Sequence, residues 1–199
     1  MSVMVAGTWV GPRLPSVAEV AQAWVACSQR PYSWLKGDPY AQIEAHLREL
    51  WQQIVRLNQE GTAEPLLVVP GSLADPIGAG QTWADLSHAW ELPVLLTLPR
   101  RAAMSQAIAF AALLRQSRAR CLGWVLLGEP EFAPTIATDE VSECQLDSPP
   151  SLPPEAWDEL DSTLAACLEA QVGIPVLGRV DPQQQVNWDQ DALAMMGYV

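Results

Sequence analysis

The loop that follows residues 66–69 carries the residue types of a nucleophilic catalyst. Ser72 opens this loop, and Asp75 and His88 follow it closely in the chain. Such a set can perform acyl transfer, because a histidine can take the serine proton while a carboxylate orients the histidine. The flanking sequence reads PGSLA, however, and lacks the G-x-S-x-G pattern of a nucleophile elbow. The residue types permit this chemistry, but the spacing does not favour it.

Arg100 and Arg101 form a second candidate site. They directly follow an apolar run that ends at Leu98, so they stand at the end of a predicted strand. Two guanidinium groups at that position can bind an anion. A pair of solvated arginines is the plainer interpretation, and it is the one that we expect.

The cysteines indicate neither a zinc site nor a disulfide framework. They lie far apart, form no C-x-x-C pair, and share the chain with only two histidines. We expect buried, reduced thiols that pack as small apolar groups. The four are Cys27, Cys121, Cys144 and Cys167.

The elements that must position these residues alternate between strands and helices. The strands are apolar on both faces, which is typical of a parallel sheet that helices cover on both sides. The sequence therefore predicts an α/β protein with three layers, α/β/α, around a mainly parallel sheet. Strands are expected at 1–7, 66–69, 93–98, 121–127 and 174–177, and helices at 16–27, 39–58, 82–90, 104–118 and 154–171.

Length and composition favour one cytoplasmic domain. The chain has 199 residues, of which 49% are hydrophobic, so residues 1–199 can bury a core as a single domain. No apolar run is long enough to span a membrane, and the first residues lack the pattern of a secretory signal. We therefore expect a cytoplasmic protein without a membrane span.

The charge balance argues against two classes of partner. The chain has 11 basic and 23 acidic residues, and its net charge of −12 repels nucleic acid and anionic lipid. Acidic residues and prolines concentrate in a predicted surface loop at about 129–153. Two interpretations of this loop stay open: a solvated excursion, or a docking surface for a basic partner.

Residues 74–129 resemble the second half of the ATP-dependent dethiobiotin synthases. That family has a strand that runs into V-E-G-A-G-G-L-x-x-P, then T-x-x-D-L, L-P-V-x-L-V and G-x-V-L-N. Residues 174–180 are similar to the family's P-V-L-G-x-x-P segment, and MSVMVAGT resembles its first strand and the Gly-Thr of its phosphate loop. The resemblance implies a fold like that of the P-loop NTPases. The matching residues are Pro76, Thr82, Asp85, Leu86, Leu92, Pro93, Val94, Gly123, Val125 and Leu126.

The phosphate loop of this chain departs from the pattern that binds nucleotides. After Gly7 and Thr8 the sequence reads WVGPRLPS, whereas a phosphate loop needs G-x-x-x-x-G-K-[ST]. Two prolines remove amide donors, and no lysine is present. Gly7, Thr8 and Arg13 are thus the residues of a degenerate phosphate loop, with Arg13 as the stand-in charge.

Two further positions of the resemblance have lost their polar groups. The metal-linked glutamate falls on Val68, and the asparagine that recognises adenine falls on Leu127. The short distance along the chain from Thr8 to Val68 also implies an internal deletion. We therefore expect a catalytically inactive relative, without a cofactor, that serves as a binding or structural component. The alternatives are an ATP- and magnesium-dependent dethiobiotin synthase, which carboxylates 7,8-diaminopelargonic acid, and a binder of small ligands in the emptied pocket.

Aromatic residues supply the interface candidates. Nine tryptophans are many for this length, and tryptophan is enriched in protein interfaces. Trp9 and Trp34 are expected in loops, and Tyr40 and Trp51 on the helix at 39–58. We expect these residues to contact a protein partner or a second copy, since the family's enzymes are dimers.

Overall fold

The computed structural model describes residues 2–8, 17–28, 30–37, 43–128, 154–181 and 185–197. Trp9, Arg13 and Tyr40 lie outside the described residues, as does the acidic stretch 129–153. The predictions that concern them are therefore not addressed by the structure.

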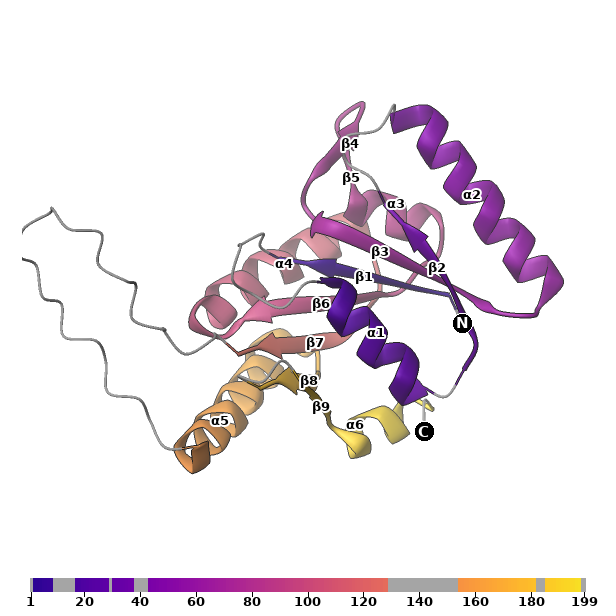
Figure 1. Cartoon of the computed structure of the whole chain (residues 1–199). Coiled ribbons are helices and arrows are strands. Elements are labelled where there is room, and N and C mark those ends of the chain that lie inside the picture. Colours follow the sequence, from indigo (N-terminus) through magenta and orange to yellow (C-terminus); the bar gives the residue numbers. More distant parts are fainter. Residues whose placement is uncertain are drawn as a thin grey trace, which may run out of the picture.

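A seven-stranded sheet forms the centre of the described part of the molecule (Figure 1). Neighbouring strands run parallel throughout, except for the last pair, which is antiparallel. A separate antiparallel hairpin consists of β4 (Pro76–Gly78) and β5 (Gln81–Thr82). In spatial order the sheet contains β2 (Tyr32–Lys36), β3 (Glu64–Ser72), β1 (Val3–Gly7), β6 (Val94–Pro99), β7 (Cys121–Leu127), β8 (Val176–Val180) and β9 (Val186–Trp188).

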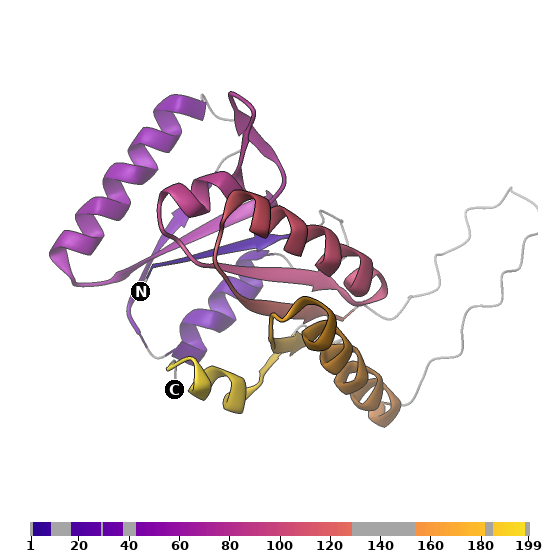
Figure 2. The same cartoon turned by 180° about the vertical axis from the view of Figure 1, so that it is seen from behind.

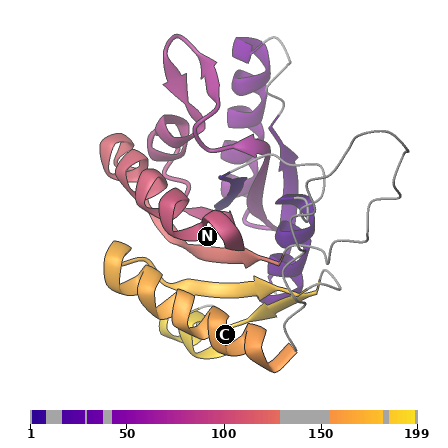
Figure 3. The ribbon, with the colours of Figure 1, turned by 90° about the vertical axis from the view of Figure 1, so that its left-hand side faces the viewer.

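Helices cover both faces of this sheet. One face packs on α1 and α6, and the other packs on α2, α3, α4 and α5. Figure 1 shows α1 in front of the sheet, and Figure 2 shows α4 in front from the opposite side, with the layers seen from a third direction in Figure 3. The helices are α1 (Val17–Ser28), α2 (Ile43–Glu60), α3 (Trp83–Ala89), α4 (Ala103–Ser117), α5 (Pro154–Val172) and α6 (Gln190–Met195), with a short 3₁₀ turn η1 (Arg100–Ala102) before α4.

The buried strands divide their side chains between two apolar clusters. Along β1, Val3 and Val5 face α1, while Met4 and Ala6 face the opposite layer. All four side chains are fully buried. Because side chains alternate along a strand, a strand covered on both faces must be apolar at every position. None of the described helices is long and apolar enough to cross a membrane.

The predicted architecture is confirmed. The sheet is mainly parallel and lies between two helical layers, and β7 has the predicted boundaries. The sequence analysis missed the hairpin and the elements β2, β9 and α6. Trp34 was expected in a loop, and that prediction is wrong, because Trp34 lies in the middle of β2. An edge strand keeps exposed residues and lacks the continuous apolar pattern of a central strand.

Candidate functional site

The carboxyl ends of β3, β1 and β6 lie side by side, since these strands are neighbours in the sheet. Open parallel sheets bind ligands at this edge. Gly7 is the last residue of β1, and Thr8 follows it. The structure thus places both predicted residues where a phosphate loop would begin.

Thr8 is bound to β6 through its backbone and its side chain. Its amide donates to the carbonyl of Thr97 over 3.2 Å, and its hydroxyl donates to the same carbonyl over 2.9 Å. The hydroxyl also contacts the side-chain amide of Gln106 on α4. Thr8 is buried, so these internal contacts replace hydrogen bonds to water. The polar groups of Thr8 are already used inside the protein.

The turn after β3 is fixed to β1 and to α3. The amide of Leu73 donates to the carbonyl of Gly7 over 2.9 Å, and the carbonyl of Leu73 accepts from the amide of Ala84 over 3.1 Å. The side chain of Leu73 is fully buried. This turn is therefore anchored in the core and joins three elements at the candidate edge.

Asp75 closes the same turn with its carboxylate. Its Oδ2 accepts from the amide of Ser72 over 2.8 Å, and the hydroxyl of Ser72 accepts from the amide of Ala74 over 3.2 Å. A Cβ atom at Gly71 would meet the Oδ2 of Asp75, so a larger residue at this position would displace the carboxylate from the amide of Ser72. The one charged side chain of the loop thus satisfies a backbone amide that would otherwise be free to bind an anion.

A nucleophilic triad is not assembled from the predicted residue types. His88 lies in the last turn of α3 and is exposed, whereas Ser72 and Asp75 bond within their own turn. Among the described residues no hydrogen bond joins His88 to Ser72 or to Asp75. Without a base on the serine hydroxyl, this group has no activated nucleophile.

Arg100 forms a buried ion pair instead of a solvated pair with Arg101. Its Nη2 lies 2.5 Å from the Oδ2 of Asp161 on α5, and the two side chains are only 13% and 3% exposed. The prediction of solvation is therefore wrong for Arg100, because α5 covers it. Arg101 is exposed. The Oδ1 atom of Asp161 is buried and has no hydrogen-bond partner among the described residues.

Sequence reasoning missed Asp161 as a functional or structural group. It stands in an acidic part of the chain, and its partner lies 61 residues away. The one feature of the sequence that could have indicated its burial is its spacing from nearby apolar residues. Asp161 precedes the apolar positions Leu164 and Leu168 by three and seven residues, which places it on the buried side of the helix.

The two described interface candidates lie on opposite faces of the sheet. Trp34 is 46% exposed and stands beside Leu66 on the α1 face. Trp51 is 41% exposed on α2, and its ring lies 5.4 Å from that of Trp90 at an angle of 34°. The structure therefore does not bring Trp34 and Trp51 together into one patch.

The cysteines differ in burial. Cys27 and Cys121 are partly buried, whereas Cys167 is exposed, so the prediction of buried thiols is wrong for Cys167. Burial raises the pKa of the Cys121 thiol to about 12, and it also raises the pKa of Cys27. Cys144 lies outside the described residues. No group of three or more His, Cys, Asp or Glu side chains in the described ranges could hold a metal ion.

Magnesium and ATP, which the resemblance implies, do not fit the described residues of this edge. Val68 and Leu127 are 5% and 3% exposed and belong to the apolar core. A valine and a leucine can neither ligate magnesium nor hydrogen-bond to adenine. The amides of Thr8 and Ser72 are engaged with Thr97 and Asp75.

Comparison with known proteins identifies the family of this chain. The family model AAA_26, described as an AAA domain, matches residues 27–190. This range begins after β1, so Gly7, Thr8 and Arg13 lie outside the match.

Two curated proteins, both named ATP-dependent dethiobiotin synthetase BioD, are similar to part of the chain. The protein from Synechocystis sp. (strain ATCC 27184 / PCC 6803 / Kazusa) is 32% identical over 105 residues, which cover 52% of this chain and 44% of that protein. The protein from Gloeothece citriformis (strain PCC 7424) is 33% identical over 81 residues, which cover 40% and 35%. The chain thus spans less than half the length of these relatives. The chain belongs to the AAA_26 family, as a BioD-like member with the α/β fold of the P-loop NTPases.

Proposed function

We propose that this chain is a catalytically inactive BioD-like domain that serves as a binding or structural component of a protein complex. The observation that carries this proposal is the internal use of polar groups at the carboxyl edge. Thr8 bonds to Thr97, and the amide of Ser72 bonds to Asp75. A phosphate site needs free amides and a lysine, and the segment 9–16 supplies one cation, Arg13, and two prolines.

A BioD enzyme is the second candidate function. Its support is the printed name of the two relatives, which match at 32% and 33% identity. Under this alternative, Arg13 would replace the phosphate-loop lysine, and the chain would carboxylate 7,8-diaminopelargonic acid with ATP and magnesium. A planar guanidinium is a poor substitute for a compact ammonium at such a site.

The component role implies a partner, and two regions are candidates for its contact. One is the acidic stretch 129–153, which suits a basic partner. The other is the set of exposed aromatic residues, of which Trp34 and Trp51 are described. Under this proposal, residues 1–199 form one domain of a cytoplasmic protein.

A product assay tests the proposal against its alternative. The purified protein is incubated with 7,8-diaminopelargonic acid, bicarbonate, ATP and magnesium, and dethiobiotin is measured by mass spectrometry. We expect no dethiobiotin above a control without protein. Formation of dethiobiotin that is lost in an Arg13→Ala variant would establish the enzyme instead.

A second experiment tests the component role. The native protein is purified by affinity from its source, and the stoichiometry of any co-purifying protein is measured. We expect one partner in a fixed ratio, with weaker retention after residues 133–150 are trimmed. A trimmed protein that fails to fold would show that this stretch is part of the packed structure.

A further inference from the structure

Positive charge is concentrated at one end of α4, although the chain as a whole has a net charge of −12. Residues 92–128 contain five arginines and no acidic residue. Three of the five lie between the last turn of α4 and the start of β7, and all three are exposed. We call Arg115, Arg118 and Arg120 the arginine cluster.

Backbone hydrogen bonds fix the turn that carries the arginine cluster. The amide of Arg118 donates to the carbonyl of Arg115 over 3.3 Å, and the carbonyl of Arg120 accepts from the amide of Val94 over 2.8 Å. Arg115 and Arg118 are one helical turn apart, which places their Cβ atoms about 5–6 Å from each other. The Cα atoms of Arg118 and Arg120 are at most about 7.6 Å apart, because two peptide units separate them. The three side chains can therefore bind one ligand together.

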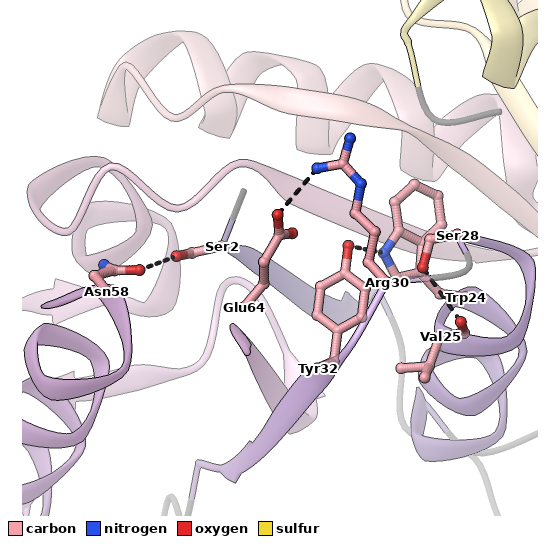
Figure 4. Close-up of polar contacts among 8 residues, drawn as sticks. All are labelled: Ser2, Trp24, Val25, Ser28, Arg30, Tyr32, Asn58 and Glu64. Atoms are coloured by element: carbon pink, nitrogen blue, oxygen red, sulfur yellow. Dashed lines mark hydrogen bonds and ion pairs between the residues drawn. The ribbon is translucent and has the colours of Figure 1, made fainter. Parts of the chain in front are cut away.

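The arginine cluster forms no ion pair with any described residue. Arginines elsewhere in the described chain do form such pairs. Arg30 binds Glu64 at 3.0 Å (Figure 4), and Arg100 binds Asp161 at 2.5 Å. The cluster therefore differs from these arginines in having no carboxylate of its own protein as a partner.

Two acidic side chains lie at the corresponding ends of the helices that pack on α4. Glu91 follows α3, and Glu169 lies in the last turn of α5. Glu169 accepts from the amide of Val176 over 3.1 Å, so its carboxylate is already engaged. Neither residue forms an ion pair with the cluster. The three guanidinium groups are thus accessible to an anion from outside.

We propose that the arginine cluster binds an acidic, extended segment of a partner protein. A guanidinium group binds a carboxylate through two parallel hydrogen bonds, and arginine clusters recognise acidic motifs in other proteins. Most of this chain repels an acidic partner because of its net charge. An approaching acidic segment is therefore directed to the one stretch in which positive charge prevails.

An exposed apolar side chain favours a protein segment over a small anion. Ile108 is 54% exposed and stands seven residues before Arg115, so the two side chains lie on the same face of α4. About 10 Å of helix separates them, which a small anion cannot span. A peptide can bind the arginines with its carboxylates and cover Ile108 with an apolar side chain.

This inference rests on the proposed component role and adds the chemical class of a partner to it. The acidic stretch 129–153 suits a basic partner, whereas the arginine cluster suits an acidic one. Three exposed ion pairs are weak, so we expect a dissociation constant on the order of 100 µM at low ionic strength. Salt screens these pairs, and binding should weaken as its concentration rises.

Fluorescence anisotropy of a labelled peptide of eight glutamates, titrated with the full chain, tests the proposal. Arg118→Gly should weaken binding by about threefold, as expected for the loss of one exposed ion pair. Residue 118 has a φ of 59°, which glycine adopts without strain, so this variant keeps the turn. Replacing Arg115 and Arg120 by glutamine as well should abolish binding.

Arg48→Gln is the matched control for the loss of one positive charge. Arg48 is exposed on α2 and has no ion pair among the described residues, so this variant should bind the peptide like the wild type. Circular dichroism verifies that every variant is folded. An equal loss of binding in Arg48→Gln and Arg118→Gly, or a wild type that does not bind at low ionic strength, would overturn the proposal.

Chemical protection then locates the bound peptide. Phenylglyoxal modifies exposed arginines, and the peptide should protect the arginine cluster but not Arg48 from this reagent. Equal protection of Arg48 would overturn the proposal. Tighter binding of an oligonucleotide of eight thymidines through the same arginines would also overturn it, because the site would then recognise phosphates. The cluster lies at the amino end of β7, away from the carboxyl edge, so these results are separable from the assay for dethiobiotin.

Discussion

The backbone polar groups differ in their hydrogen bonding between two regions of the sheet, the carboxyl edge of β1 and β3 and the outer edge of β2. At the carboxyl edge, the amides of Thr8, Ser72 and Leu73 all have internal partners. At the outer edge, the amides and carbonyls of Trp34 and Lys36 have no partner among the described residues. In the described part of the chain, the amides at the carboxyl edge are bonded within the protein, whereas the amides on the outer side of β2 are not.

The proposed loss of the ligand site agrees with this contrast. A buried amide without a partner costs free energy, so a site without its ligand must satisfy its amides from within. Asp75 does so for Ser72, and Thr97 does so for Thr8. An exposed edge has no such requirement, because water can bond to it until a partner displaces the water. Each variant below changes residues near one of these two edges and should leave the structure of the other edge unchanged.

The largest effect is expected at the buried ion pair that covers the carboxyl end of β6. Asp161→Ala removes a carboxylate that pairs with the buried guanidinium of Arg100, so the free energy of unfolding should fall by about 3–5 kcal/mol. Denaturant unfolding followed by circular dichroism measures this change. Glu159→Ala, at an exposed position of the same helix, serves as the control and should change stability by less than about 0.5 kcal/mol. A loss below about 1 kcal/mol in Asp161→Ala would mean that the pair is not buried as described.

The next effect concerns the turn that Asp75 closes. Gly71→Ala places a methyl group against the carboxylate, so the variant should lose about 1–3 kcal/mol of stability. Asp75→Ala removes the obstructing oxygen, and the double variant should therefore be more stable than the sum of the two single losses predicts. Additive losses in this double-mutant cycle would contradict the contact between Asp75 and Gly71.

A smaller effect is expected at the ion pair that holds the start of β2. Arg30→Gln removes the positive charge beside Glu64, and because both side chains are partly exposed the loss should be at most about 1 kcal/mol. The pKa of Glu64 is lowered in the folded protein, so the contribution of this pair is present above the ordinary value of 4.5 and is lost as the pH falls through the lowered pKa. Urea unfolding of both proteins at neutral and acidic pH measures this difference. A gap that widens toward low pH would contradict this assignment.

The smallest effect on monomer stability is expected at the two exposed tryptophans. Trp34→Lys and Trp51→Lys, measured at concentrations too low for association, should differ from the wild type by about 1 kcal/mol or less, because neither ring is in the core. Trp83→Ala should cost about 3–5 kcal/mol by comparison, since that ring is 1% exposed. A large loss in Trp34→Lys would assign this residue to the packing of the monomer instead of an interface.

The central strands and long helices were predictable from the sequence because burial on both faces leaves a continuous apolar signal. Residues 121–127 illustrate this, since every position of β7 after Cys121 is buried. β2 escaped prediction because an edge strand alternates Trp34 and Lys36 with a single buried residue, Leu35. The sequence pattern of such a segment is typical of a loop as well as of an edge strand.

The strand end that carries Gly7 and Thr8 was predictable from the sequence, but the hydrogen bonds of the residues around it were only partly so. The position of Gly7 and Thr8 at a strand end followed from the sequence, since the apolar run Val3–Ala6 ends there. The partner of Asp75 is local, so a turn cap was in principle readable from the Ser72–Asp75 spacing. The partners of Thr8 and Arg100 lie 89 and 61 residues away, and only the fold brings them together.

Calorimetric titration of the purified protein with ATP and magnesium tests the central claim most directly. The described amides of Thr8, Ser72 and Leu73 at this edge are engaged, and the loop 9–16 has no lysine, so the protein should bind ATP no more tightly than in the millimolar range. Arg13→Ala, the matched variant, should then behave like the wild type. A micromolar dissociation constant that Arg13→Ala abolishes would contradict the account and restore the nucleotide site.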